Sequence, residues 1–561
     1  MRRIGILKRP WVLSFLALIP IIWAYATHFI GVHPGYIATG FLQYDQASYM
    51  ADARQYADGP FHFLYGLPFS PNYDTPRIYF QPQIFFLGVI LRITGLDPGL
   101  LYVAFGLVAA LGFFRIAIAL YTAVVGLETP GQKIMLPAFL WGGGVVVLLS
   151  AYLLSVYHKP ISSAHIFWLE RTNGYWMMNL GRNAFYSVEA YYHALFLGAV
   201  LMIVRKYYLA ALVLIAALSA SHPFTGFELA LIATVWTLAE SIYWRHTAPP
   251  VWFSACTVAV LLLHVGYYLI LLKWLSPEYV AVESQWNLDW KLEWYNIVAA
   301  FSPVFAAVVW RLRNRRRIVD AFSDRTFRIL FGWFAVSITL AKHDLFITPR
   351  QPLHFTHGYI WASLFLMGAP TMTKVADRLL MRSGLLGLAT ALILLGFMLT
   401  DNIVWFGRFG AYELSGKDFA DSPLVMTTNE ADVLHRLNES HLNGSLVLSD
   451  SNSLAYLTTV YTPLRCWYSH IHSTPYALER ESQTKAFFSN GTEVEGWRSR
   501  PTIVVHAKAV GSEHGTLFRR LGYYLIYQNA SFQVFYAPRR ALISAGTSGR
   551  TSTTATVPTR K

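Results

Sequence analysis

Two carboxylates and two phenols recur at one helical spacing near the start of the chain. Asp45, Tyr49, Asp52 and Tyr56 follow one another at the intervals of a single helical face. A carboxylate just beyond a membrane span can act as a general base, and Arg54 adds a cation beside it. The pattern equally fits an interfacial helix whose acids stay in water and whose tyrosines form an aromatic belt.

The composition places the chain in a membrane. Of its 561 residues, 55% are hydrophobic and 14% are charged, which is too apolar for a soluble enzyme of this length. The net charge of +14 comes from Lys and Arg clustered between apolar runs, the pattern that sets membrane orientation, so we exclude a nucleic-acid partner. Cys256 and Cys466 form neither a metal cluster nor a disulfide framework.

The apolar runs predict a polytopic α-helical membrane protein with about 11 transmembrane helices. A basic segment, 1–9, precedes the apolar run 11–30, which we interpret as a retained signal anchor with a cytoplasmic N-terminus. The apolar run 81–93 is short and predicts a juxtamembrane or re-entrant helix. The remaining spans are expected at about 99–124, 133–154, 184–204, 207–221, 224–244, 251–275, 295–310, 326–342, 355–372 and 384–402.

This topology places the basic clusters in the cytoplasm and the long aromatic loops outside. The cytoplasmic residues include Lys133, Arg245, the 311–317 cluster and Arg328. Long loops gathered on one face indicate an active-site vestibule, whereas a pore would carry its polar residues at mid-membrane depth. The candidate binding residues on the outer side are Arg54, Arg77, Glu170, Arg171, Glu189, His193, His222, His343, Arg350 and His354.

Several of these candidates have a structural alternative. Glu189 and His193 lie one turn apart near the outer end of a span, where they could serve function or tie two helices together. His222 precedes Pro223, and we favour a tight outer turn over a substrate contact there. Arg350 and His354 suit a phosphate clamp, because Arg grips phosphate through paired hydrogen bonds.

The chain divides into three parts on these patterns. Residues 1–402 form the transmembrane domain with an external loop at 31–98, and 403–541 form a small extracytoplasmic α/β domain with strands near 445–449 and 502–506. The Ser/Thr-rich tail 542–561 is predicted to be disordered.

The whole arrangement resembles the GT-C integral-membrane glycosyltransferases, which include aminoarabinose transferases and protein O-mannosyltransferases. The resemblance rests on Tyr44-Asp45-Gln46-Ala47-Ser48-Tyr49, which is similar to their Asp-Glu-x-x-Tyr-type motif with Gln46 in place of the second acid. It continues in Tyr79-Phe80-Gln81-Pro82-Gln83, which looks like a variant of their Tyr-Lys-Pro-Pro segment. The many short-looped spans and the C-terminal domain complete it.

The resemblance implies hexosyl or pentosyl transfer from a polyprenyl-phosphate donor to a lipid, glycan or protein acceptor outside the plasma or inner membrane. Asp45 is then the catalytic base, Tyr49 orients it, and Asp52 assists it or binds a metal. A divalent metal is possible, but two carboxylates seven residues apart do not establish one. The alternative is a membrane transporter or a non-catalytic protein that binds lipid-linked glycans, although the sequence shows no internal repeat of the transporter kind.

Overall fold

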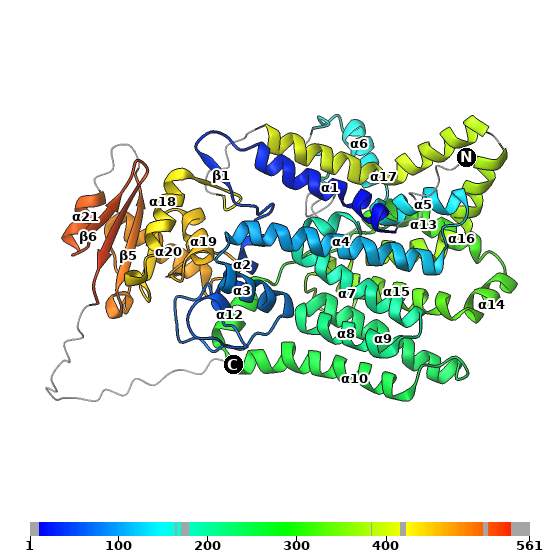
Figure 1. Ribbon diagram of the computed structural model, residues 1–561, viewed down its shortest axis with the longest axis horizontal. Coiled ribbons are helices and arrows are strands. Elements are labelled where there is room, and N and C mark those ends of the chain that lie inside the picture. Colours follow the sequence, from blue (N-terminus) through cyan, green and yellow to red (C-terminus); the bar gives the residue numbers. More distant parts are fainter. Residues whose placement is uncertain are drawn as a thin grey trace.

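A helical bundle occupies most of the molecule, and a mixed sheet with its helices lies at one end of it (Figure 1). The computed structural model describes residues 10–162, 165–169, 179–382, 384–415, 422–508 and 514–539.

Six helices among the described residues are long and apolar enough to cross a membrane, or up to eight if two bent pairs each count as one span. Such helices are the mark of an integral membrane protein. A helix lies in every other predicted span, but none of these helices alone combines the length and the hydropathy of a membrane span, so the count of about 11 is not confirmed. The six are Pro10–Ile30 (α1), Pro98–Val124 (α4), Ser187–Val204 (α7), Pro223–Tyr243 (α9), Val251–Leu275 (α10 to α11) and Gly384–Leu414 (α17).

The remaining helices of the bundle are shorter, bent or more polar. The helix predicted at 81–93 is present as α3 (Pro82–Thr94), and α17 runs past the expected end at 402. The others are α2 (Gln46–Ala57), α5 (Pro130–Trp141), α6 (Val146–Val156), α8 (Tyr208–Ser221), α12 (Pro277–Gln285), α13 (Trp294–Arg311), α14 (Arg315–Ser323), α15 (Arg325–Ala341) and α16 (Tyr359–Arg382).

A glycine run breaks the span made of α5 and α6, which meet at 65°. Gly144 has a φ of +85°, and a Cβ there would lie 2.3 Å from the carbonyl oxygen of Ala300. The first backbone N–H groups of α6 are buried, and the carboxylate of Asp401 in α17 accepts those of Val146 and Val147 at 3.1 and 2.9 Å. A buried carboxylate thus replaces the helix hydrogen bonds lost at the break.

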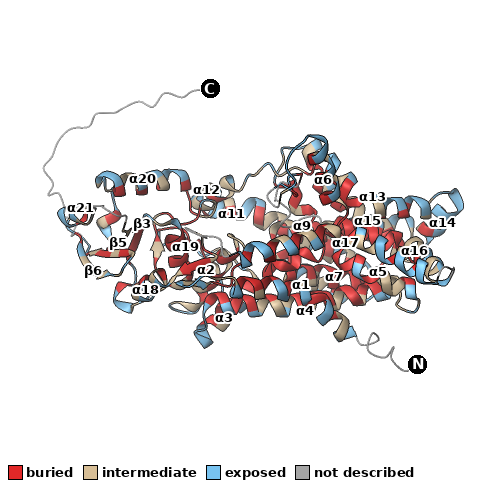
Figure 2. Ribbon diagram, turned by 90° about the horizontal axis from the view of Figure 1, so that it is seen from above, coloured by how far each residue is buried: buried red, intermediate tan, exposed pale blue. Residues whose placement is uncertain are grey.

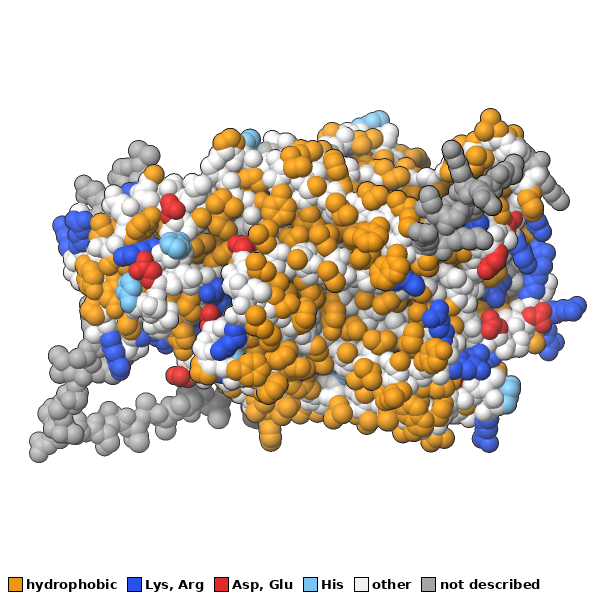
Figure 3. Space-filling model, viewed as in Figure 1, with side chains coloured by type: hydrophobic (Ala, Val, Ile, Leu, Met, Phe, Trp, Pro, Cys, Tyr) orange, Lys and Arg blue, Asp and Glu red, His pale blue; other side chains and the backbone are white. Residues whose placement is uncertain are grey.

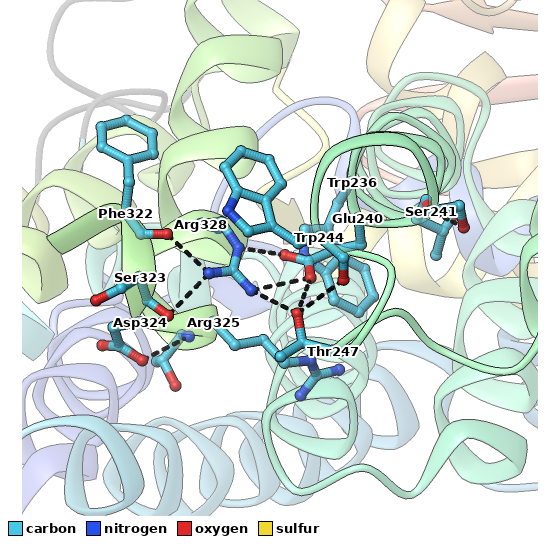
Figure 4. A network of polar contacts seen from close by, with 12 residues as sticks. Trp236, Glu240, Ser241, Trp244, Thr247, Phe322, Ser323, Asp324, Arg325 and Arg328 are labelled. Atoms are coloured by element: carbon cyan, nitrogen blue, oxygen red, sulfur yellow. Dashed lines mark hydrogen bonds and ion pairs between the residues drawn. The ribbon is translucent and has the colours of Figure 1, made fainter. Parts of the chain in front are cut away.

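An ion pair fastens α9 to α15 (Figure 4). The guanidinium of buried Arg328 donates to both carboxylate oxygens of Glu240, at 2.6 and 2.9 Å. It also donates to Thr247 Oγ1 and to the carbonyl oxygens of Phe322 and Ser323. Arg328, which the sequence placed in a cytoplasmic charge cluster, therefore holds a helix junction together.

The C-terminal segment, residues 422–539, contains a five-stranded sheet in the order β4-β3-β5-β7-β6. Its first three strands are parallel, and β7 pairs antiparallel with β5 and β6. The strands are β3 (Leu446–Ser449), β4 (Arg465–Cys466), β5 (Thr502–Ala507), β6 (Tyr524–Gln528) and β7 (Phe532–Ala537), and the helices are α18 (Thr428–Leu437), α19 (Asn452–Tyr461), α20 (Ala477–Asn490) and α21 (His514–Arg520).

The C-terminal segment is joined to the loop after α1. Strand β1 (Tyr36–Ala38) pairs antiparallel with β2 (Val425–Thr427), and α19 packs on α2, as Figure 2 also shows. Tyr73 donates a hydrogen bond of 3.1 Å to the carbonyl oxygen of Ser445. In Figure 3 hydrophobic side chains cover the middle of the visible face, while Lys and Arg gather toward its two ends.

Candidate active site

Asp45 stands at the start of α2, where the bundle meets the C-terminal segment. Among the described contacts its carboxylate makes no capping hydrogen bond to α2, although it occupies the N-cap position. Instead, Oδ2 accepts from Gln43 Nε2 at 3.1 Å, and Oδ1 lies 3.5 Å from His470 Nε2. An acid that only started the helix would bond to the backbone, so this carboxylate is directed elsewhere.

Asp52 lies two turns further along α2 among tyrosines. Desolvation by the surrounding chain raises the pKa of Asp52 well above its ordinary value. Desolvation also raises the pKa of four neighbouring phenols, and the charge of Asp52 raises each of them further by a smaller amount. These phenols are Tyr49, Tyr56, Tyr65 and Tyr79.

Tyr49 links the two acids of α2 to the bundle. Desolvation raises the pKa of Tyr49 most, and the carboxylates of Glu189, Asp45 and Asp52 raise it further. Its ring stacks on Tyr102 of α4 at 6.5 Å. Three carboxylates therefore lie within electrostatic reach of one phenol, which supports the predicted face of α2.

Glu189 and His193 of α7 both contact the start of α16. Glu189 Oε2 lies 3.2 Å from His357 Nδ1, and His193 Nε2 donates to the carbonyl oxygen of His357 at 2.9 Å. The Tyr359 hydroxyl lies 3.2 Å from His193 Nδ1. The pair thus joins two helices, as one of its two interpretations predicts, while Glu189 also lies near Tyr49.

His222 and His354 lie on the same side of the bundle. His222 occupies the turn between α8 and α9, as predicted, where Nδ1 accepts the backbone N–H of Thr225 at 3.1 Å. Its ring stacks on Tyr192 of α7 at 4.7 Å. His354 lies in the turn Pro352–Phe355 and stacks on Phe224 at 4.6 Å.

The second motif of the resemblance reaches α7 as well. Gln83, at the start of α3, donates to the hydroxyl of Tyr192 at 3.0 Å and to the carbonyl oxygen of Ser221 at 3.3 Å. Desolvation raises the pKa of Tyr79 most, and the charges of Tyr279 and Asp52 raise it further. Helix α2, which begins within the first motif, packs on α3, which carries Gln83, so the two motifs, about 35 residues apart in sequence, lie on neighbouring helices.

The predicted phosphate-binding residues lie on different parts of the chain: α2, the loop before α3 and the loop after α15. Arg54 Nε donates to Asp58 Oδ2 at 3.1 Å, and Arg77 is exposed. His343 is held within its own loop, where Nε2 accepts the backbone N–H of Arg350. The Arg350 guanidinium is 58% exposed and donates to Glu283 of α12 at 3.0 Å.

Two predicted residues, Glu170 and Arg171, lie outside the described residues. Within the described ranges no group of three or more His, Cys, Asp or Glu side chains is arranged to hold a metal ion. Sequence reasoning missed His470, which comes from the C-terminal segment. Its pattern His470-Ile471-His472, two histidines in a polar loop, was the available signal.

The arrangement defines a class of protein: a polytopic helical bundle whose acidic first loop packs against a C-terminal α/β segment. No family model and no curated protein matches the chain. The apo oligosaccharyltransferase of Archaeoglobus fulgidus superposes with a TM-score of 0.50 at 11% identity, covering 90% of this chain and 70% of that one. The chain therefore has a GT-C-like fold.

Two other solved structures are similar at lower TM-scores. ArnT from Cupriavidus metallidurans bound to undecaprenyl phosphate gives a TM-score of 0.45 at 14% identity, covering 94% of this chain and 98% of that one. AglB from Archaeoglobus fulgidus in complex with an inhibitory peptide and a dolichol-phosphate gives 0.42 at 12% identity, covering 95% and 75%.

Proposed function

We propose that the protein is a glycosyltransferase that moves a hexosyl or pentosyl group from a polyprenyl-phosphate donor to an acceptor hydroxyl outside the membrane. The observation that carries the proposal is Asp45, a carboxylate free of capping that faces His470 where the apolar bundle ends. The resemblance of the sequence and the GT-C-like fold support the donor class.

In this reaction Asp45 removes the proton of the acceptor hydroxyl as its oxygen attacks C1 of the sugar. The bond between C1 and the phosphate oxygen breaks, and its electron pair leaves with the polyprenyl phosphate. A cation must stabilise that leaving group. Arg350 is our choice, because it is exposed and lies within electrostatic reach of Tyr279, whose ring is 5.8 Å from Tyr79.

Asp45→Asn tests the base. Asn is nearly isosteric, so the protein should still insert and bind its lipid donor, but it cannot accept a proton and should lose about 100- to 10,000-fold in rate. The assay uses purified protein and a panel of labelled undecaprenyl-phosphate sugars, with donor binding measured in parallel. Full activity of Asp45→Asn would remove Asp45 as base, and donor binding without transfer by the unmutated protein would indicate a non-catalytic binder.

We propose that the N-terminus is cytoplasmic and that the C-terminal segment is extracytoplasmic. The support is geometric, since α14 with Arg315 to Arg317 lies at the end of the bundle far from the sheet (Figure 1). Reporter fusions at about residues 320 and 430 should report opposite sides of the membrane. Both reporters on one side would overturn this orientation.

A further inference from the structure

His470 belongs to the C-terminal segment but lies against the start of α2. It is fully buried in the loop between β4 and α20. Its ring packs between the rings of Tyr44, Phe69 and Tyr456, with centroid distances of 5.0, 5.3 and 5.0 Å. The imidazole is therefore held in one orientation by aromatic contacts.

The contacts of His470 fix which ring nitrogen carries the proton. Nδ1 accepts the backbone N–H groups of His472 and Ser473 at 3.1 and 3.0 Å. A nitrogen that accepts two hydrogen bonds carries no proton, so the neutral ring is protonated at Nε2. His470 Nε2, which carries this proton, lies 3.5 Å from Asp45 Oδ1.

The two oxygens of Asp45 therefore face one N–H donor each. Gln43 donates to Oδ2, and His470 approaches Oδ1. Desolvation of Asp45 would raise its pKa, but the interaction with His470, followed by the Gln43 donor and the charge of His472, outweighs it, so the pKa of Asp45 lies below its ordinary value. Other titratable groups around Asp45 include the adjacent Tyr44, Tyr49 of α2 and Tyr456 of α19.

The loop that carries His470 is fastened to an external helix of the bundle. Gln285, at the end of α12, donates to the carbonyl oxygens of His472 and Thr474 at 3.2 and 2.8 Å. Its side-chain oxygen accepts the backbone N–H of Ala477 at 2.7 Å. One glutamine thus holds both ends of the loop in place.

We propose that His470 is a positioning residue that orients Asp45 and keeps it ionised through Nε2–H, a role that rests on the proposed function of Asp45 as the base. The C-terminal segment would then complete the active site by contributing this residue. The chemistry at C1 still belongs to Asp45, because His470 acts through the carboxylate.

Two substitutions separate the contacts of His470. His470→Asn keeps an acceptor near the Nδ1 position and removes the donor, whereas His470→Gln keeps a donor near the Nε2 position. With purified full-length protein in detergent, His470→Asn should lower the thermal midpoint by a few degrees at pH 8 and by less at pH 3, below the ordinary aspartate pKa of 3.8, where Asp45 begins to be protonated. The loss at pH 8 should disappear when Asp45→Asn is already present.

An equal loss at both pH values, unchanged in the Asp45→Asn background, would overturn the proposal in favour of a loop contact only. If His470→Asn does not fold, His470→Gln is the deciding variant. Because it retains a donor near Nε2, its thermal midpoint should depend on pH as that of the unmutated protein does. Loss of that pH dependence in His470→Gln would contradict the proposal.

A second measurement separates this proposal from the proposed function. On a labelled undecaprenyl-phosphate sugar, His470→Asn should lower kcat about 10- to 100-fold with little change in KM for the donor, and it should move the acid limb of kcat/KM to higher pH. Full activity of Asp45→Asn would show that Asp45 is not the base. The thermal midpoints of His470→Asn with and without Asp45→Asn would still test whether His470 acts on Asp45. If Asp45→Asn is inactive but His470→Asn has the same kcat and the same pH profile of kcat/KM as the unmutated protein, only the role of His470 is contradicted.

Discussion

Gly88 of α3 lies so close to Ala53 of α2 that a Cβ on Gly88 would be 2.4 Å from the carbonyl oxygen of Ala53. It would also lie 2.6 Å from the Cβ of Tyr56. The absence of a side chain at residue 88 therefore sets the distance between α2, which Asp45 precedes, and α3, which carries Gln83.

We expect Gly88→Ala to push α2 away from α3. The clash involves backbone atoms, so it should cost about 1–3 kcal/mol of stability and lower transfer activity together with it. The control is Gly112→Ala in α4, where a Cβ would meet nothing within 4 Å. That variant should be neutral or gain up to about 1 kcal/mol. Thermal unfolding in detergent would measure both, and equal behaviour of the two would contradict this account of Gly88.

Asp52→Asn should stabilise the protein at high pH. Because the pKa of Asp52 is raised above its ordinary value of 3.8, folding keeps a proton there that the unfolded chain releases, and stability falls as pH rises from that value. Asn removes this cost at pH 8 and changes little at pH 4. Asp45→Asn should show the opposite sign, because the lowered pKa of Asp45 contributes stability at high pH that is lost only below pH 3.8, as the carboxyl protonates. Thermal midpoints at pH 8, pH 4 and pH 3 decide, and a matching response of both variants would refute the environments of Asp45 and Asp52.

Arg350→Ala should weaken the use of the donor while the fold persists. A lost charge-assisted hydrogen bond to phosphate corresponds to roughly 10- to 150-fold in KM. The side chain is exposed and paired only across the surface with Glu283, so stability should change by less than about 1 kcal/mol. Arg519→Ala, on exposed α21, serves as the control for net charge. If the KM for the donor is unchanged in Arg350→Ala, Arg350 does not bind the phosphate, and Arg54 and Arg77 become the candidates.

Glu240→Gln should destabilise the protein strongly. It leaves the buried guanidinium of Arg328 facing a neutral amide, and breaking such a buried pair typically costs about 3–5 kcal/mol. The matched control is Arg316→Gln, which removes an exposed charge of α14 nearby. Thermal unfolding should separate them clearly. A drop no larger than that of the control would show that the junction of α9 and α15 does not depend on this pair.

The parts of the fold that sequence predicted well were those set by local pattern. The spacing from Asp45 to Tyr56 predicted α2, and the apolar runs at 445–449 and 502–506 predicted β3 and β5. What sequence did not predict depends on contacts between distant residues. Nothing local distinguishes Arg328 of α15 from the neighbouring basic residues that face water, and its role became visible only with Glu240 beside it.

In the candidate site too, the residues set by local pattern were predicted and the residue brought in from a distant part of the chain was not. Asp45, Tyr49 and Asp52 were predicted because one helix presents them together. His470 stands 425 residues after Asp45 and approaches it only because α19 packs on α2. A single sequence carries no signal for such a pairing, apart from the two histidines close together in a loop.

The pairing of β1 with β2 also has a consequence for biosynthesis. Tyr36 pairs with Thr427, so the first of these strands leaves the ribosome 391 residues before its partner. At about 5–20 residues per second, the earlier strand waits roughly 20–80 s with its edge open. During that interval the loop bearing Asp45 lacks both its β partner and α19. The nascent chain therefore completes its candidate active site only at a late stage of translation, and a factor that shields this edge would improve the yield of folded protein.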